Sequence, residues 1–241
     1  MTTAEVQEWL DSQQLSRQSY VNNRCVAHLL FTFAVARGFA ADNPVAAVEN
    51  LKARAGEVEV FTPTQINKLL AAASPEFLPS LAIGAFAGLR SAEIERLEWS
   101  DLRVAEKCIV VGASKAKTAS RRIVSLADNL AVWLAPYAGQ SGFVWGGSHE
   151  AFYDAQQTTA AASMVKWKAN ALRHSYASYR FAQTSDAGRV AGELGNSAAV
   201  VHKHYRELVK TSDAERWFAA RPAGVDNVIP LPAAPGLLHL D

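Results

Sequence analysis

Five side chains lie along this sequence in an order that could support chemistry on a phosphodiester. Arg173, Asn196 and Tyr205 are separated by 23 and 9 residues, and Arg90 and Lys117 precede them. Arginine guanidinium groups bind phosphate oxygens through paired hydrogen bonds and stay charged at neutral pH. A tyrosine hydroxyl can attack phosphorus to form a covalent intermediate, and a lysine ammonium can protonate a leaving oxygen. Because phosphoryl transfer depends mainly on positioning and charge stabilisation, such a set can act without a metal ion.

Helices are expected to position the second half of this set. From about residue 149 to about residue 219 the apolar periodicity predicts helices that break at three points. Asn170 precedes Arg173 by three positions, so a helix places the two side chains on the same side. Upstream, Arg90 directly follows the turn that Gly88 is expected to make, just before another helix.

A small sheet is expected to carry the lysine. Residues 103–111 and 122–126 are rich in β-branched side chains and predict a hairpin or a small antiparallel sheet. Lys115 and Lys117 both lie in the connection between these runs. Residues 143–147 predict one further strand and a turn. The fold class expected is therefore mainly α with a small antiparallel β-sheet.

Three regions are expected along the chain. Residues 1–57 predict a short helical domain with a polar linker, and its third helix would begin at Asp42-Asn43-Pro44. This region is too short to bury a large core alone. Residues 58–220 form the second domain, and residues 221–241, which contain four prolines, are expected to be a disordered tail.

The net charge of +1 gives no overall attraction to a polyanion, but two stretches are basic and free of acids. One lies between Glu106 and Asp128, and the other lies between Asp154 and Asp186. The candidate nucleic-acid contacts from these stretches are Lys115, Arg121, Arg122, Lys166 and Lys168. A solvated basic face is the alternative interpretation of the same pattern.

Other features exclude some protein classes. No run approaches the roughly 18 to 20 apolar residues of a membrane span, and the N-terminus lacks a secretory pattern. Cys25 and Cys108 have no metal-ligand spacing, so a cytoplasmic location is expected. His202 and His204 would face different sides of a helix, and no metal or other cofactor is expected.

In the order and spacing of its motifs, the chain resembles the tyrosine recombinase, or phage integrase, family. The resemblance rests on Thr62-Pro63-Thr64-Gln65-Ile66, Gly88-Leu89-Arg90, Leu172-Arg173-His174-Ser175 and Tyr205-Arg206-Glu207-Leu208. It covers the chain from Thr62 to about Ala219, and residues 1–57 look like a shortened form of the family's core-binding domain. It implies site-specific cleavage and rejoining of DNA strands through a 3′-phosphotyrosine, without metal or ATP.

The resemblance also implies roles for individual residues. Arg90 and Arg173 would hold the scissile phosphate, Tyr205 would be the nucleophile, and Lys117 would protonate the leaving 5′-oxygen. Glu93, three residues after Arg90, would orient that arginine. Lys115 is the alternative to Lys117, because it lies only two residues away.

Two positions depart from the family pattern. Asn170 and Asn196 stand where the family usually has histidine. An amide cannot exchange protons near neutral pH, although it can donate a hydrogen bond to a phosphate oxygen. Both asparagines are therefore expected to bind the phosphate, with general-base help weak or supplied by His174 or His204. A buried packing role is the alternative for His174.

Double-stranded DNA is the implied partner, with four protomers assembled on two sites and accessory DNA-bending proteins. In the family, the segment after the tyrosine helix docks on a neighbouring protomer. Here Trp217 and Phe218 could dock in that way or fold back onto their own domain. Two other functions remain open: a DNA-binding relic or regulator of the same fold, and a helical protein–protein interaction module.

Overall fold

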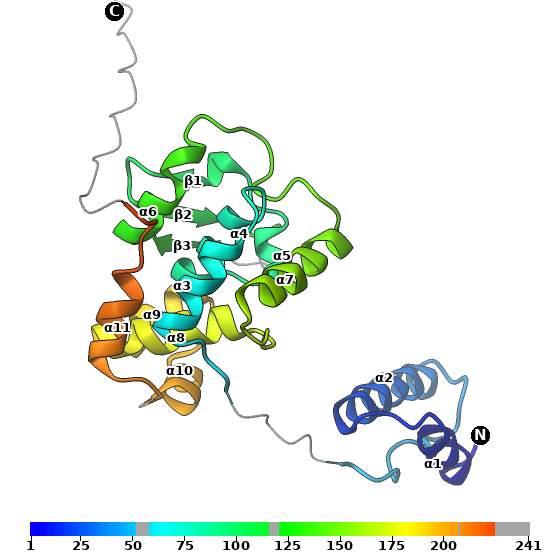
Figure 1. The fold of residues 1–241 in the computed structure, drawn as a ribbon. Coiled ribbons are helices and arrows are strands. Elements are labelled where there is room, and N and C mark those ends of the chain that lie inside the picture. The colour runs from blue at the N-terminus through cyan, green and yellow to red at the C-terminus, as the bar shows by residue number, and fades with distance from the viewer. Residues whose placement is uncertain (52–57, 116–120, 207, 225–241) are drawn as a thin grey trace, which may run out of the picture. The chain divides into compact units, whose positions relative to one another are not determined.

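A computed structural model describes residues 1–51, 58–115, 121–206 and 208–224. The chain divides into two units, Met1–Glu57 and Val58–Asp241, and each is described by itself (Figure 1). The described residues are mostly helical and include one three-stranded antiparallel sheet. The predicted fold class is therefore confirmed.

The first unit contains two helices, α1 (Thr3–Ser12) and α2 (Arg17–Ala36). The side chain of Thr2 accepts a hydrogen bond from the Glu5 N–H, and the Glu5 carboxylate accepts one from the Thr2 N–H, so a capping box starts α1. The buried side chains of this unit are Val6, Leu10, Tyr20, Val45 and Val48. Such a small core agrees with the short length of the unit.

The prediction of a third helix after Pro44 is wrong, because residues 44–47 form turns and residues 42 and 48 are bends. The Thr3 hydroxyl donates to the Pro44 carbonyl. The Arg24 guanidinium donates to the carbonyls of Val45 and Val48. Side chains of α1 and α2 thus occupy carbonyls that a further helix would have used for its own hydrogen bonds.

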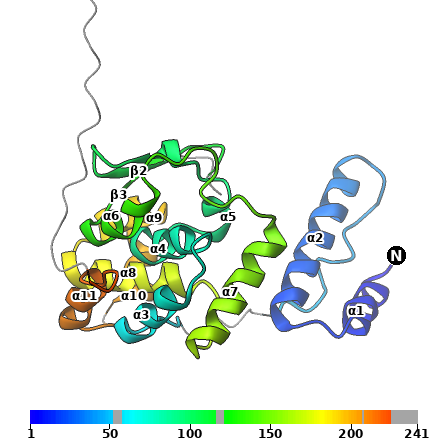
Figure 2. The same cartoon turned by 45° about the horizontal axis from the view of Figure 1, so that its top comes forward.

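The second unit is built around α4 (Leu78–Ala87), in which every residue from Pro79 to Ala87 is buried. Helices α3 (Pro63–Ala72), α6 (Asp128–Leu134) and α8 (Ala171–Thr184) pack against it. The Thr62 hydroxyl caps α3 in the way that its threonine–proline start predicts. Figures 1 and 2 both place the sheet and α6 at one end of this unit and α8 at the other.

The sheet has the order β1–β2–β3, with both pairs antiparallel. Its strands are β1 (Leu102–Arg103), β2 (Cys108–Val111) and β3 (Arg122–Ser125). A turn at Lys107, with φ of 50°, splits the first predicted run into two strands. The predicted strand at residues 143–147 is reduced to an isolated bridge between Phe143 and Glu98. Two 3₁₀ turns, Trp99–Asp101 and Ala135–Tyr137, flank these elements.

The remaining helices follow in sequence. They are α5 (Ser91–Ile94), α7 (His149–Ser163), α9 (Ala187–Leu194), α10 (Ala198–Tyr205) and α11 (Thr211–Phe218). Trp217 of α11 is fully buried in its own unit, donates to the Ala85 carbonyl at 3.1 Å and stacks on Tyr179. Within the described chain α11 therefore docks in cis.

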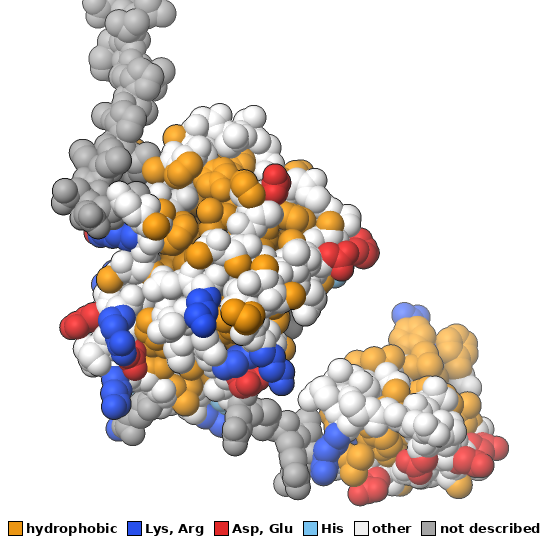
Figure 3. Space-filling view, in the orientation of Figure 1, with side chains coloured by type: hydrophobic (Ala, Val, Ile, Leu, Met, Phe, Trp, Pro, Cys, Tyr) orange, Lys and Arg blue, Asp and Glu red, His pale blue; other side chains and the backbone are white. Residues whose placement is uncertain are grey.

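The surface of the second unit is uneven in charge. On the face shown in Figure 3, lysine and arginine side chains gather over the end that holds α8, α10 and α11, and few lie over the sheet end. None of the helices in the described ranges combines the length and apolar character that a membrane crossing needs.

Candidate active site

Arg173 lies in the first turn of α8 and is 7% exposed. Its guanidinium donates to the Gly88 carbonyl at 2.8 Å, the Leu194 carbonyl at 2.6 Å and the Asn196 side-chain oxygen at 3.3 Å. All three acceptors are uncharged. Burial, reinforced by the positive charge of Arg90, lowers the pKa of Arg173 to about 10. A cation so placed would be stabilised by an anion.

Two glycines shape the turns that supply these acceptors. Gly88 ends α4 with φ of +66°, and Gly195 ends α9 with φ of +64°. A Cβ at Gly88 would lie 2.3 Å from a ring carbon of Tyr176, so no other residue fits there without displacement. The turn at Gly88 also starts the segment that carries Arg90.

A carboxylate that is 1% exposed, Glu93, holds Arg90 in place. It accepts from the Arg90 backbone N–H at 2.8 Å and from the Arg90 guanidinium at 3.0 Å. The Arg122 guanidinium donates to both of its oxygens, at 3.0 and 2.7 Å. Burial works to raise the pKa of Glu93, but the hydrogen bonds from Arg122 and Arg90 outweigh it and hold that pKa below its ordinary value.

Asn196 brings the two arginines together. Its side-chain oxygen accepts from Arg90 at 3.4 Å and from Arg173 at 3.3 Å. Around it, the three positive charges of Arg90, Arg122 and Arg173 face the one negative charge of Glu93, a net charge of +2. The arrangement forms a positively charged junction of α4, α5, α8 and α9.

Tyr205, at the end of α10, is 5% exposed, and its hydroxyl lies 3.1 Å from Nδ1 of His174. Burial raises the pKa of Tyr205, against the opposing effect of Arg173 and Arg90. Burial, followed by Arg173 and His204, lowers the pKa of His174. A neutral imidazole can accept the phenolic proton. The His204 ring lies 6.4 Å from the Tyr205 ring.

Sequence reasoning missed a second buried carboxylate, Glu193 of α9. It accepts from Tyr176 at 2.8 Å, from Ser125 at 3.0 Å and from two Arg180 nitrogens at 3.1 and 2.9 Å. Its own backbone carbonyl accepts from Arg122 at 2.9 Å. The network therefore ties α8, α9 and β3 together behind the arginines. Its sequence signal is a single acid within the apolar stripe of α9.

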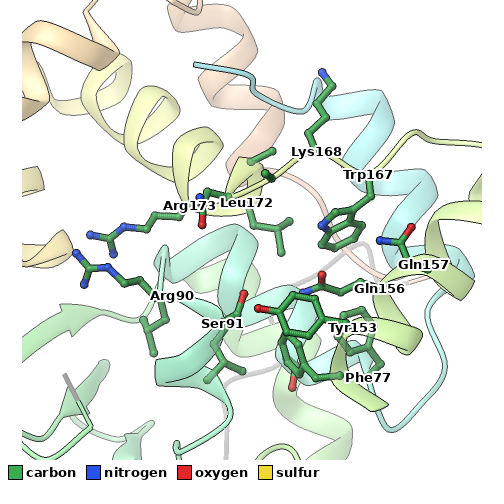
Figure 4. A pocket seen from close by; sticks show the side chains of 17 residues that line it. Phe77, Arg90, Ser91, Tyr153, Gln156, Gln157, Trp167, Lys168, Leu172 and Arg173 are labelled. Carbon is green, nitrogen blue, oxygen red and sulfur yellow. The ribbon is translucent and has the colours of Figure 1, made fainter. Parts of the chain in front are cut away.

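Asn170 lies at the entrance of α8 in a left-handed conformation, with φ of 56°, and its side chain does not cap the helix. It lines a pocket of about 370 Å³ together with Arg90 and Arg173 (Figure 4). The structure thus gathers four of the predicted catalytic side chains around one junction, with Asn170 at the adjoining pocket.

The two candidate lysines of the β-connection differ. Lys117 lies outside the described residues. Lys115 donates to Glu98 at 3.1 Å and to Asp101 at 2.6 Å. Burial acts to lower the pKa of Lys115, but these carboxylates outweigh it and raise that pKa. Lys115 is therefore held as a cation by its own unit.

The remaining four predicted DNA contacts differ in their exposure. Lys166 and Arg121 are exposed. Lys168 donates to the Val60 carbonyl at 2.9 Å, and the Arg122 side chain is largely buried between the two carboxylate networks. Across the part of the chain that the structure describes, no group of three or more His, Cys, Asp or Glu side chains is placed to hold a metal ion.

Comparisons with known proteins give the fold. No protein-family model matches the sequence, and no curated protein matches it either. A lambda integrase dimer bound to a COC′ core site is similar, with a TM-score of 0.70, 18% identity, and coverage of 87% of this chain and 83% of that one. XerA recombinase gives a TM-score of 0.55 at 16% identity, with coverage of 91% of this chain and 83% of that one. The Tn1549 transposon integrase in complex with circular intermediate DNA gives a TM-score of 0.63 at 15% identity, with coverage of 89% of this chain and 83% of that one. This chain has the fold of the tyrosine recombinases and integrases.

Proposed function

We propose that this protein is a site-specific DNA recombinase that cleaves and rejoins strands through a covalent bond to Tyr205. The Tyr205 oxygen attacks a DNA phosphorus, the bond from phosphorus to the 5′-oxygen breaks, and that oxygen takes a proton. The observation that carries the proposal is the shared hydrogen bonding of Arg90 and Arg173 to Asn196, next to a tyrosine bonded to a histidine.

Charge supports a phosphate as the group that occupies this junction. Arg173 is buried and its hydrogen-bond partners are all neutral, so its charge is uncompensated by a direct carboxylate contact. Arginine forks fixed before the reaction stabilise the charge on non-bridging oxygens without reorganising. Asn196 can turn its amide to donate to the same phosphate, because its two ends differ in hydrogen-bonding character.

Proton transfer from the nucleophile falls to His174 in this proposal. Its Nδ1 is 3.1 Å from the Tyr205 hydroxyl, within reach for a direct transfer. The lowered pKa of His174 keeps the ring neutral and able to accept. Asn170 and Asn196 stand where the family usually has histidine, and their amides cannot accept a proton in this way. His174 would supply the proton acceptor that these two positions lack.

The leaving 5′-oxygen needs a proton donor, and we assign that role to Lys117. Lys115 has two carboxylate partners, which supports the choice of Lys117 over its neighbour. Arg122 acts as a positioning residue in the proposal, because its two hydrogen bonds fix the carboxylate of Glu93 that aligns Arg90.

The proposed partner is double-stranded DNA, with self-association on it. Similar solved structures include a lambda integrase dimer on a COC′ core site and a tetramer on a Holliday junction. Lys166 and Arg121 remain candidate backbone contacts because both are exposed. The two units correspond in this proposal to a short core-binding domain and a catalytic domain.

The test is to trap the covalent intermediate. A pool of duplexes with random sequence, each with one nick, lets the short fragment beyond a cleaved bond diffuse away and leaves the protein attached. We expect a DNA adduct that survives denaturation with the natural chain and is absent with Tyr205→Phe. Salt-dependent binding without an adduct supports the DNA-binding relic instead, and the absence of salt-dependent binding supports the interaction module.

A further inference from the structure

The pocket that begins at the arginine pair continues well beyond it. It has a volume of about 370 Å³, which lies in the range of small-molecule sites. Figure 4 shows Arg90 and Arg173 at one end, and Tyr153, Gln156 and Trp167 at the other. The proposed cleavage chemistry uses only the first end, so the second end has no assigned role.

Aromatic rings form much of the second end. Tyr153 of α7 is 43% exposed, and Trp167 is half-buried, with its ring centroid 5.8 Å from that of Phe61 in an edge-to-face contact. Phe77 and Phe152 are buried behind them and contact each other edge to face, with ring centroids 5.5 Å apart. Exposed aromatic faces on a fixed support are the surfaces on which unstacked nucleobases pack.

Unpaired polar groups lie among these rings. Gln156 is 4% exposed, and its amide, which has no hydrogen-bond partner within the described residues, opens onto the pocket, where water reaches it. The Ser80 hydroxyl in the same wall is also buried without a partner in the described ranges. A ligand in the pocket would give both groups a hydrogen-bond partner that the described residues do not supply. An amide can both donate to and accept from the edge of a base.

The middle of the pocket is formed by the start of α8. Ala171, Leu172 and Arg173 line it, and no side chain caps the helix there. The N-terminus of a 14-residue helix favours an anion. The pocket therefore offers an anion site at the arginine end and a site for a planar polar ring at the other, which together match one nucleotide.

We propose that this pocket receives an unstacked nucleobase from the strand whose phosphate Arg90 and Arg173 hold. The base stacks on Trp167 and Tyr153, and its polar edge hydrogen-bonds to Gln156. This inference rests on the proposed function, because it takes the phosphate between the arginines to be part of DNA. It adds that the strand is distorted next to the cleaved bond.

Duplex binding followed by the fluorescence of 2-aminopurine tests the inference without knowledge of the target site. Two duplexes of one arbitrary sequence each carry a single 2-aminopurine, which is paired in one duplex and unpaired in the other. Since an unpaired base costs little to unstack, we expect the natural chain to bind the second duplex about fivefold more tightly or better. Gln156→Leu and Trp167→Ala should still bind the paired duplex but should no longer distinguish the two duplexes. Gln140→Leu, outside this pocket, is the control and should keep the preference.

Three results would overturn the inference. One is equal binding of the two duplexes by the natural chain, and another is a preference that survives Gln156→Leu. The third is tight binding of free 2-aminopurine nucleotide that depends on Gln156, since the occupant would then be a free nucleotide. A preference for the unpaired base without any Tyr205 adduct would contradict the proposed function and support the base-binding role of the pocket. An adduct without that preference would support the proposed function and contradict the base-binding role.

Discussion

Replacing Glu93 by glutamine is expected to destabilise the second unit strongly. The Glu93 carboxylate is buried and receives four hydrogen bonds from Arg90 and Arg122. A glutamine would keep the shape but lose the charge and place an NH₂ group against a guanidinium. Removing one partner of a buried ion pair leaves uncompensated charge, which costs about 3–5 kcal/mol. For a unit of this size, each kcal/mol lowers Tm by about 2–4 °C.

Urea unfolding followed by tryptophan fluorescence measures this loss, because five of the six tryptophans lie in the second unit. The control is Glu106→Gln, which breaks an exposed ion pair with Arg103 of β1 and should cost less than about 1 kcal/mol. Equal effects of the two substitutions would refute the reasoning that Glu93 anchors the arginines.

The pH dependence gives a second readout of the same group. The pKa of Glu93 is below its ordinary value of 4.5, so its contribution is present above pH 4.5 and is lost as pH falls through the lower folded value. The stability gap between the natural chain and Glu93→Gln should therefore be constant near neutral pH and narrow only below pH 4.5. A gap that stays constant to strongly acidic pH would contradict the ion-pair account.

Three further substitutions test separate parts of the structure. Trp217→Ala should cost about 3–5 kcal/mol at any protein concentration, because the indole packs within its own unit; a concentration-dependent loss would indicate docking between protomers. The rate of adduct formation should fall at a pH below 6.5, the ordinary pKa of histidine, as the pH drops through the lowered pKa of His174 and the ring becomes protonated. The pH–rate profile of His174→Asn should lack that fall. Gly88→Ala should unfold the unit in urea denaturation or greatly reduce soluble protein, since its Cβ would collide with Tyr176, whereas Gly146→Ala, with open space around it, should not.

The fold could be predicted where local rules decide it. The turn expected at Gly88 depends only on its neighbours in sequence, and the structure confirms it between α4 and α5. The helix expected after Pro44 failed for the opposite reason. Its carbonyls are occupied by Thr3 and Arg24, which lie far away in sequence.

In the candidate site, too, some features follow from the sequence and others depend on contacts between distant residues. The order of Arg90, Arg173 and Tyr205 is visible in the sequence, but their partners depend on tertiary packing. Charge counting assigned Arg122 to a basic surface, whereas the folded chain buries it between Glu93 and the Glu193 carbonyl. No local pattern tells which acid will be buried beside which arginine, because both are more often exposed.

The most direct test of the central claim is to locate the covalent bond. The trapped adduct would be digested with nuclease and protease, and the peptide that retains a nucleotide would be identified by mass spectrometry. The account predicts a 3′-nucleotide on Tyr205, formed at a greatly reduced rate in Arg173→Ala. A nucleotide on any other residue, or an adduct that persists in Tyr205→Phe, would contradict it.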